Sequence, residues 1–463
     1  MDGGACDPPP DAGCSDAGVA SPQEAYLKAD ISQSSLQLGR SVAMDGNTIV
    51  AGSEAYPLGN GNAGAALVYT RDCNGWSLQA VLKPDNPGND QFGRSVAISG
   101  DTIVVGAQDE DGPGDSRSDS GAAYVFTRCG SSWMQSAYLT ASNAGNSDRF
   151  GHKVAISGDL IVVGAPEEDS DATTIDGDQL NDDAKQAGAA YVFRRAPGGW
   201  AQEAYLKASN AETFDNFGFS VGVSGNTIIV GATGEDSPAS GVDGSLGNDP
   251  TYTESGAVYV FVRDGSAWSQ QAYVKASNNG ANLFLGESLA IDGDTFVAGS
   301  VNENSDSTGV NGSQMSVYES TGAAYVFFRS GTAWTQQAYV KASNTGANDN
   351  FGESVAVSGD LLLIGAPKED GSVPGLNGDG TDDGTDGAGA AYLYTRTGDS
   401  WTFSTYIKAS SPGLADLFGT GVAISGPSFV VSAMFEDSGA TGTNGDESDN
   451  SKGNSGALYV FRP

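Results

Sequence analysis

The chain has 463 residues, of which 58 are Asp or Glu and only 22 are Lys or Arg, so its formal net charge is −36 at pH 7. This excess of negative charge excludes nucleic acid and anionic membranes as partners, because both are bound through clustered Lys and Arg. No window of 18 residues is apolar throughout, which excludes a transmembrane segment. The expected partners are cations and basic or neutral molecules.

Residues 1–22 are rich in Pro, Gly and Asp and are predicted to form a disordered leader. They lack the apolar core of a signal peptide, so a mature or trimmed form is expected. Two of the four cysteines, Cys6 and Cys14, lie in this leader, and Cys73 and Cys129 lie in equivalent hairpins of consecutive repeats. An even number favours an oxidising compartment, with three possible pairings, and unpaired cysteines are the alternative. Cys6 is alternatively a lipid-anchoring site.

From residue 23 to residue 463 one unit of sequence recurs seven times. In the second copy its four β-rich runs are residues 92–98, 102–107, 122–128 and 133–140, which we name A to D. Val, Ile, Tyr and Phe alternate with other residues in these runs, and Gly separates them, which is typical of strands. A four-stranded meander repeated around an axis predicts an all-β fold, a seven-bladed β-propeller of four-stranded antiparallel blades.

The two ends of the chain predict how the ring closes. A D run at residues 24–29 precedes the first complete unit, and the last unit stops after its C run at residues 457–462. The N-terminal strand is therefore predicted to complete the last blade and to remove the exposed sheet edges. This connectivity places the short A–B and C–D turns on one face and the long, acidic B–C and D–A loops on the other, where binding is expected.

The unit resembles the FG-GAP repeat of integrin α-subunit propellers and of bacterial surface and secreted proteins. The resemblance rests on Phe150-Gly151 with Gly164-Ala165-Pro166 and on Phe351-Gly352 with Gly365-Ala366-Pro367. It implies a seven-bladed propeller in extracellular recognition or adhesion, often with calcium. The calcium loop that the family carries between these two motifs is absent here, because the link shrinks to turns such as Ser157-Gly158-Asp159. Three residues cannot supply six to eight oxygen ligands.

The B–C loops carry a second acidic pattern, in which Asx-Gly is followed by further acids or amides. Oxygen ligands around a Gly turn suit Ca²⁺, and ordinary turns in solvated loops are the alternative. The predicted calcium ligands are Asp176, Asp178, Asn181 and Asp182 in blade 3, Asp243, Ser245, Asn248 and Asp249 in blade 4, Asn377, Asp379, Asp382 and Asp383 in blade 6, and Asn444, Asp446, Asp449 and Asn450 in blade 7.

A Glu-Asp pair follows the Gly-Ala-Pro position in most copies. It either completes the same cation sites or, as we expect, caps the strand ends or forms a solvated rim. The pairs begin at Glu110, Glu168, Glu235, Glu369 and Glu436, with Glu303-Asn304 as a variant.

The residue after each Phe-Gly is predicted to lie at the mouth of the central channel, on the loop face. A ring of mixed charge there could hold a small polar or zwitterionic ligand, whereas mutual pairing of the charges is the alternative. The ligand-binding residues predicted for this mouth are Arg40, Arg94, His152, Phe219, Glu287 and Glu353, and Thr420 completes the ring.

Catalysis receives little support, because His152 is the only histidine and no nucleophile or metalloprotease motif is present. We therefore expect a monomeric recognition or adhesion module, secreted or surface-tethered, that binds an extracellular protein or glycan through its acidic loops with calcium as the ordering ion. The alternatives are a polysaccharide-degrading propeller enzyme that uses the channel mouth and a purely structural module of an envelope or matrix.

Overall fold

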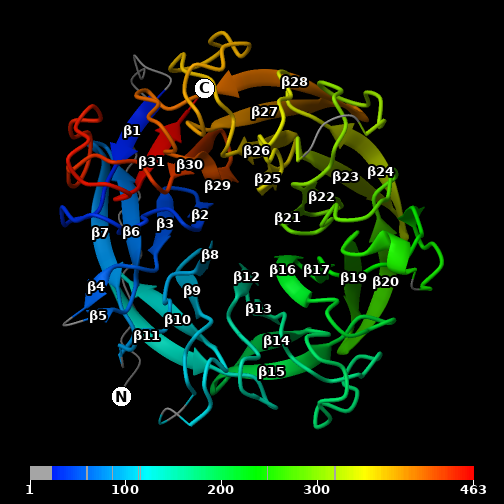
Figure 1. The fold of residues 1–463 in the computed structure, drawn as a ribbon. Helices are drawn as coiled ribbons and strands as arrows, with labels where there is room; N and C mark the ends of the chain where they lie inside the picture. Colours follow the sequence, from blue (N-terminus) through cyan, green and yellow to red (C-terminus); the bar gives the residue numbers. More distant parts are fainter. Residues whose placement is uncertain are drawn as a thin grey trace.

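The computed structural model describes residues 23–58, 61–85, 87–112, 114, 116–247, 249–316 and 320–462. The leader with Cys6 and Cys14, and the predicted ligand Asn248, lie outside this part of the chain. The described residues form seven four-stranded antiparallel blades around a central axis, which confirms the predicted seven-bladed propeller (Figure 1). No helix in these ranges has the length and apolar character needed to span a bilayer.

Each blade runs outward from the axis through strands A to D. The innermost A strands are β2 (Val42–Asp45), β8 (Ser95–Ser99), β12 (Lys153–Ser157), β16 (Phe217–Ser224), β21 (Leu289–Asp292), β25 (Ser354–Ser358) and β29 (Phe418–Ser425). The B strands are β3 (Thr48–Ser53), β9 (Thr102–Ala107), β13 (Leu160–Ala165), β17 (Thr227–Ala232), β22 (Thr295–Ser300), β26 (Leu361–Ala366) and β30 (Ser428–Ala433).

The C strands are β6 (Ala65–Asp72), β10 (Ala122–Cys129), β14 (Ala189–Ala196), β19 (Ala257–Asp264), β23 (Ala323–Ser330), β27 (Ala390–Thr397) and β31 (Ala457–Phe461). The outer D strands are β7 (Gly75–Leu82), β11 (Ser132–Leu139), β15 (Gly199–Leu206), β20 (Ala267–Lys275), β24 (Ala333–Val340), β28 (Ser400–Ile407) and β1 (Gln23–Leu27). The loops add β4 (Pro57–Leu58), β5 (Gly61–Asn62), β18 (Gly241–Val242) and a 3₁₀ helix, η1 (Pro250–Tyr252).

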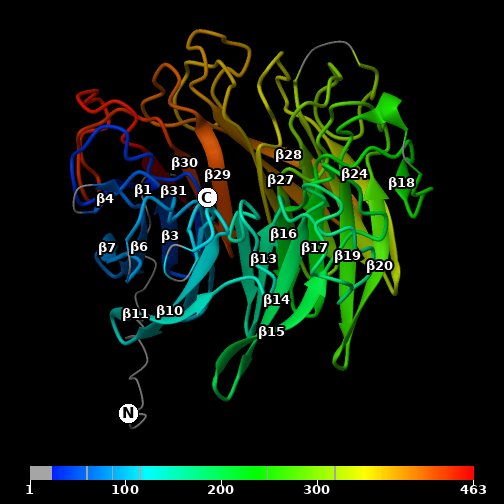
Figure 2. The ribbon, with the colours of Figure 1, turned by 60° about the horizontal axis from the view of Figure 1, so that its bottom comes forward.

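The ring closes as predicted, because β1 supplies the outer strand of blade 7. It pairs antiparallel with β31, with Tyr26 opposite Tyr459 and Leu27 opposite Leu458. Tyr26 is fully buried, and its ring centroid lies 5.2 Å from that of Tyr459. The long loops then gather on one side of the ring and the short hairpins on the other (Figure 2).

The core lies between blades rather than within one sheet. All six residues of β9 and β13 are buried, since a B strand is covered on both faces by neighbouring blades. This explains why these strands read as nearly continuous apolar runs rather than alternating ones. The Phe-Gly phenylalanine packs on the C strand of its own blade, with the Phe150 and Tyr191 ring centroids 5.3 Å apart.

The Phe-Gly motif itself mostly precedes strand A, so the prediction that the second A strand begins at residue 92 was wrong; β8 begins at Ser95. The reason is that Gly93 has a φ of +95°, which turns the chain. The preceding phenylalanine instead bridges to the blade before it, as Phe150 does to Gly121.

Glycine lets neighbouring blades meet backbone to backbone at the axis. A Cβ on Gly164, the glycine of Gly-Ala-Pro in blade 3, would lie 2.0 Å from the carbonyl oxygen of Gly218, the Phe-Gly glycine of blade 4. At five further interfaces, a Cβ on the equivalent glycine would lie 1.8–2.2 Å from the carbonyl oxygen of the glycine that faces it. At the seam between blades 7 and 1, Ser432 replaces the glycine, and its hydroxyl donates a hydrogen bond of 2.7 Å to the Gly39 carbonyl oxygen.

We predict that Gly164→Ala lowers the free energy of unfolding by about 3 kcal/mol or more, because the backbone it would strike cannot move without shifting a blade. Gly198→Ala is the matched control: no atom lies within 4 Å of its Cβ position, so its effect should stay within about 0.5 kcal/mol. Urea unfolding followed by tryptophan fluorescence measures both. Equal stability of the two variants would show that the blades do not depend on this contact.

Candidate functional site

The long B–C loops of blades 3 to 7 fold back over the outer strand of their own blade. In blade 3 the Asp176 amide donates to the Tyr205 carbonyl oxygen at 2.8 Å, and the Asp176 Oδ1 accepts from the Tyr205 amide at 2.9 Å. Asp176 has a φ of +54°, a conformation that Asn and Asp tolerate better than most residues. The same pair of hydrogen bonds, to the backbone of a tyrosine in the outer strand, is made by Asp243, Asn311, Asn377 and Asn444. This position therefore fastens the loop to the sheet edge.

Most other predicted calcium ligands hold their own loops together. Asp178 accepts from the amide of Leu180, two residues later, at 3.0 Å. The same bond to the amide two residues later is made by Asp249, Asp379 and Asp446. Asp382 and Asp449 accept from backbone amides ten residues back in the chain, as Asn181 does. Among the described residues, no group of three or more His, Cys, Asp and Glu side chains is placed to hold a metal ion. The calcium site stays a prediction.

The glutamates after Gly-Ala-Pro are buried and ion-paired rather than solvated, so the expectation of a solvated rim was wrong. In blade 3, Glu168 pairs with Lys207, which follows the outer strand β15, at 3.0 Å, and both side chains are at most 2 % exposed. The other four pairs have N–O distances of 2.5–2.8 Å: Glu235 with Lys275, Glu303 with Lys341, Glu369 with Lys408 and Glu436 with Lys28. The following Asp169 caps the loop by accepting from the Gln186 amide.

Four of the five paired glutamates, Glu168, Glu235, Glu303 and Glu369, also join two blades. Glu168 accepts from the Tyr205 hydroxyl at 2.8 Å and from the Asn143 side chain at 2.9 Å, and Asn143 belongs to the loop that leads in from blade 2. Asn143 in turn accepts from the Tyr191 hydroxyl at 2.7 Å. The loop face is therefore fastened to the rigid sheets by a satisfied polar network, which the low local dielectric strengthens.

Blades 1 and 2 depart from this arrangement. In blade 1, Tyr56 stands where the other blades have the glutamate, and Lys83 lies over its ring at 5.4 Å. In blade 2, Thr140 replaces the lysine, and Glu110 instead accepts from the Gly112 amide at 2.6 Å. The five-blade network is thus confined to blades 3 to 7, the blades with the long B–C loops.

The D–A loops add buried aspartates that the sequence interpretation missed. Asp148 is 5 % exposed and accepts from the Gly145 amide at 2.6 Å. Burial and the nearby charges of Glu168, Asp169 and Asp182 raise its pKa to about 7. Burial with Glu369, Asp370 and Asp383 raises the pKa of Asp349 to about 7 in the same way. Two predicted calcium ligands, Asp182 and Asp383, therefore lie beside these aspartates.

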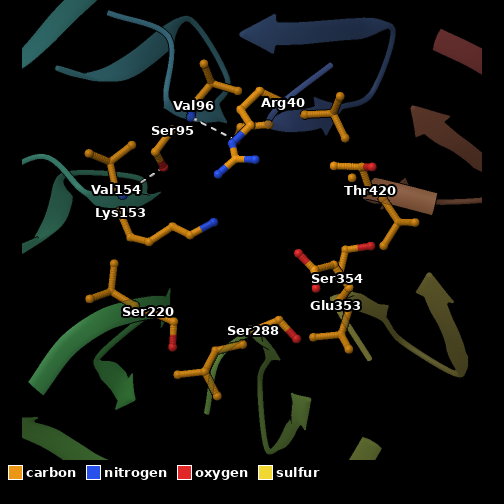
Figure 3. A pocket seen from close by; sticks show the side chains of 17 residues that line it. Arg40, Ser95, Val96, Lys153, Val154, Ser220, Ser288, Glu353, Ser354 and Thr420 are labelled. Carbon is orange, nitrogen blue, oxygen red and sulfur yellow. Dashed lines mark hydrogen bonds between the residues drawn. The ribbon is translucent and has the colours of Figure 1, made fainter. Parts of the chain in front are cut away.

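The residues predicted to ring the channel mouth lie together, and their role in binding a ligand stays a prediction. A cavity of about 110 Å³ is lined by all seven predicted residues, Arg40, Arg94, His152, Phe219, Glu287, Glu353 and Thr420, together with Lys153. Below it a second space of about 170 Å³ continues along the axis between Ser and Val side chains. Arg40 and Lys153 point into the channel, and Glu353 faces them from the other side (Figure 3).

Lys153 is the residue of the mouth that sequence reasoning missed. It occupies the second position after Phe-Gly, where five other blades have Ser and blade 7 has Gly421. The serines bind the next blade; for example, Ser95 accepts from the Val154 amide at 3.0 Å. Aligning this position across the seven copies could have singled out the one lysine.

The charged residues of the mouth are partly buried. Burial and the nearby Arg40 and Arg94 lower the pKa of Lys153 to about 8. Burial and Glu353 raise the pKa of Glu287 to about 8. Burial, Lys153 and Arg94 hold the pKa of His152 well below its ordinary value, and its Nδ1 lies 2.7 Å from the Gln108 Oε1.

Fold and site together define a closed β-propeller with one hairpin face, one face of anchored acidic loops and a polar axial cavity. The FG-GAP repeat matches residues 76–126, 133–193, 200–261 and 334–394, and the chain belongs to this family. Each match runs from the outer strand of one blade through the three inner strands of the next. A search of curated proteins found no match.

We predict that Lys207→Met lowers the free energy of unfolding by about 3–5 kcal/mol, because it leaves the Glu168 carboxylate buried and unpaired. Lys83→Met is the control at the same repeat position, where no carboxylate is buried. It should lower the free energy of unfolding by about 1 kcal/mol or less. Urea unfolding measures both. Adding Glu168→Gln to Lys207→Met should recover part of the loss; no recovery would contradict the ion-pair explanation.

Proposed function

We propose that this propeller is a recognition module that binds a protein or glycan partner outside the cell through the face of its B–C and D–A loops. The observation that carries the proposal is a set of exposed apolar side chains in the B–C and D–A loops, which we name the loop-tip residues. They are Leu180 (87 % exposed), Met315 (73 %), Leu414 (71 %), Phe214 (52 %) and Leu246 (41 %).

Five of the seven exposed large apolar side chains among the described residues are loop-tip residues. Single exposed apolar side chains are common on protein surfaces, and it is their concentration in the loops of one face that supports an interaction surface there. The loops beneath them are fastened by the buried Glu–Lys pairs, so binding would not require the whole face to become ordered. The surrounding carboxylates favour a basic or neutral partner and oppose an acidic one.

An extracellular location is supported by the cysteines. Cys73 and Cys129 are both disulfide-bonded, whereas Cys6 and Cys14 lie outside the described residues, as does the leader that would carry an anchor. Disulfides persist in oxidising compartments.

The proposal is tested with the triple variant Leu180→Ser, Phe214→Ser and Met315→Ser. Labelled protein is applied to arrays of neutral glycans and of basic extracellular proteins. We expect the wild type to bind at least one member and the triple variant to bind it about tenfold or more weakly, since each buried apolar side chain contributes roughly 1.5–3 kcal/mol. Met134→Ser, which removes an exposed methionine of β11, is the matched control.

Two outcomes contradict the proposal. One is binding by the triple variant that equals binding by the wild type and by Met134→Ser. The other is the absence of any binding by the wild type on both arrays.

The proposal includes calcium as an ion that orders the B–C loops. It is supported by the crowding of carboxylates around Asp148 and Asp349, which a divalent cation would relieve. We expect Ca²⁺ at about 100 times its Kd to stabilise the protein by about 2.7 kcal/mol per site. Thermal unfolding in Ca²⁺ against EDTA measures this.

The variant Asp182→Asn with Asp383→Asn should lose the calcium response. The control, Asp264→Asn with Asp399→Asn, removes two exposed carboxylates from the hairpin face and should retain it. An unchanged melting temperature in millimolar Ca²⁺ would remove calcium from the proposal and leave the loop-tip surface unaffected.

A further inference from the structure

The charges of the channel mouth are separated across the axis. Arg40, Arg94 and Lys153 come from blades 1 to 3, and Glu287 and Glu353 come from blades 5 and 6. The positive charge of Arg94 is partly compensated, because its Nη1 lies 3.4 Å from the Glu54 carboxylate. The cavity therefore has a cationic half and an anionic half with space between them.

The separated charges do not neutralise one another. Within the described residues, Lys153, Glu287 and Glu353 form no salt bridge and no side-chain hydrogen bond. The charge of Lys368, from blade 6, acts on Glu287 without forming an ion pair with it. In the part of the chain that the structure describes, the Arg40 guanidinium forms one hydrogen-bond contact, with the Met434 sulfur at 3.8 Å. Charges held in a confined space without partners are costly, and a ligand of complementary charge would remove that cost. Glu353 supplies the negative charge at pH 7, because Glu287, with a pKa of about 8, is largely protonated there, and a ligand ammonium would favour its ionised form.

An apolar groove continues from the anionic half. A third cavity, of about 370 Å³, shares Phe219 and Glu287 with the channel mouth and extends over blades 4 and 5. Its apolar walls are Phe219, Phe284 and Val301, and amide side chains complete it. Its volume lies at the lower end of the range for small-molecule sites, roughly 300–1,000 Å³.

We infer that the channel mouth binds a free α-amino acid with an apolar side chain. Its carboxylate would bind Arg40 and Lys153, its ammonium would bind Glu287 and Glu353, and its side chain would lie in the groove between Phe219 and Phe284. This site goes beyond the proposed partner surface and does not rest on it, because none of its residues is a loop-tip residue.

Charge, shape and size select this class of ligand. Guanidinium and ammonium groups suit a carboxylate, and an ammonium is favoured both by the two glutamates and by the face of Phe219. A phosphorylated ligand would be repelled by Glu287 and Glu353, and a cation without a carboxylate would be repelled by Arg40 and Lys153. A zwitterion of amino-acid size satisfies both halves at once.

The test is isothermal titration calorimetry of the full chain at pH 7 with L-leucine and L-phenylalanine. N-acetyl-L-leucine lacks the ammonium, L-leucinamide lacks the carboxylate, and glycine lacks the side chain. We expect leucine, phenylalanine or both to bind, and each truncated compound to bind about tenfold or more weakly, because each loses one set of charge-assisted or apolar contacts.

Two variants test the assignment of the residues. Lys153→Met and Glu287→Gln should each weaken binding about tenfold or more, whereas Lys452→Met, which removes a lysine from the blade 7 loop, should bind like the wild type. Equal melting temperatures show that a variant is folded, and Arg40→Met replaces Lys153→Met if the latter unfolds. The loop-tip triple variant should still bind leucine, which separates this site from the partner surface.

The inference is overturned if neither amino acid binds at concentrations up to about 10 mM. It is also overturned if leucinamide or N-acetyl-leucine binds as tightly as leucine, since one half of the cavity would then be unused. Wild-type affinity in folded Lys153→Met and Glu287→Gln variants would place any binding elsewhere.

Discussion

Neighbouring blades of this propeller meet at the axis through bare backbone, and the rest of the structure depends on that contact. The glycine of Gly-Ala-Pro in one blade faces the glycine of Phe-Gly in the next, as Gly164 faces Gly218, at a distance that leaves no room for a Cβ. Such a contact fixes the separation of the blades more tightly than interdigitating side chains could, because the backbone has no rotamers to adjust. The width of the channel follows, and so does the position of the residue after each Phe-Gly at its mouth.

The same geometry explains why one face can carry elaborate loops. Seven rigid blades offer fixed anchoring points, and in five of them a buried Glu–Lys pair fastens the loop face to the outer strand. The Asx residue of each long loop then binds the outer strand a second time, as Asp176 does at Tyr205. Loops that are held at two points can present apolar tips such as Leu180 and Met315 to solvent without collapsing onto the sheets. Recognition on a rigid scaffold requires this combination of anchored bases and variable tips.

The sevenfold repeat determined how much of the structure could be predicted from the sequence. Seven copies of Phe-Gly or Leu-Gly predict the blade count and, with the D run at residues 24–29, the closing strand, and both are confirmed. The residues predicted to ring the channel mouth line one cavity, and their role in ligand binding stays a prediction. The burial of Glu168 could not be predicted, because an acidic pair in a loop is usually solvated and its partner Lys207 lies 39 positions away. Lys153 was missed for another reason. Within its own repeat it is an ordinary lysine in a strand, and it stands out only when it is compared with the Ser or Gly at the same position of the other six repeats. The pKa of Asp148 is raised by burial and by carboxylates of the blade 3 B–C loop, which lies elsewhere in the sequence, so spacing does not reveal it.

The central claim is that the strand at residues 23–27 completes the seventh blade, because closure sorts the loops onto one face and assembles the channel mouth. Hydrogen–deuterium exchange of this segment, read by mass spectrometry, tests the claim most directly. If β1 pairs with β31 as described, the amide of Leu27, which lies opposite Leu458, should exchange as slowly as those of β30 and β31, through unfolding of the whole ring. The Tyr26 amide donates to the Asn444 Oδ1 and reports on the loop instead. Exchange within seconds, at the rate of an unstructured chain, would contradict closure and with it the placement of both proposed binding sites.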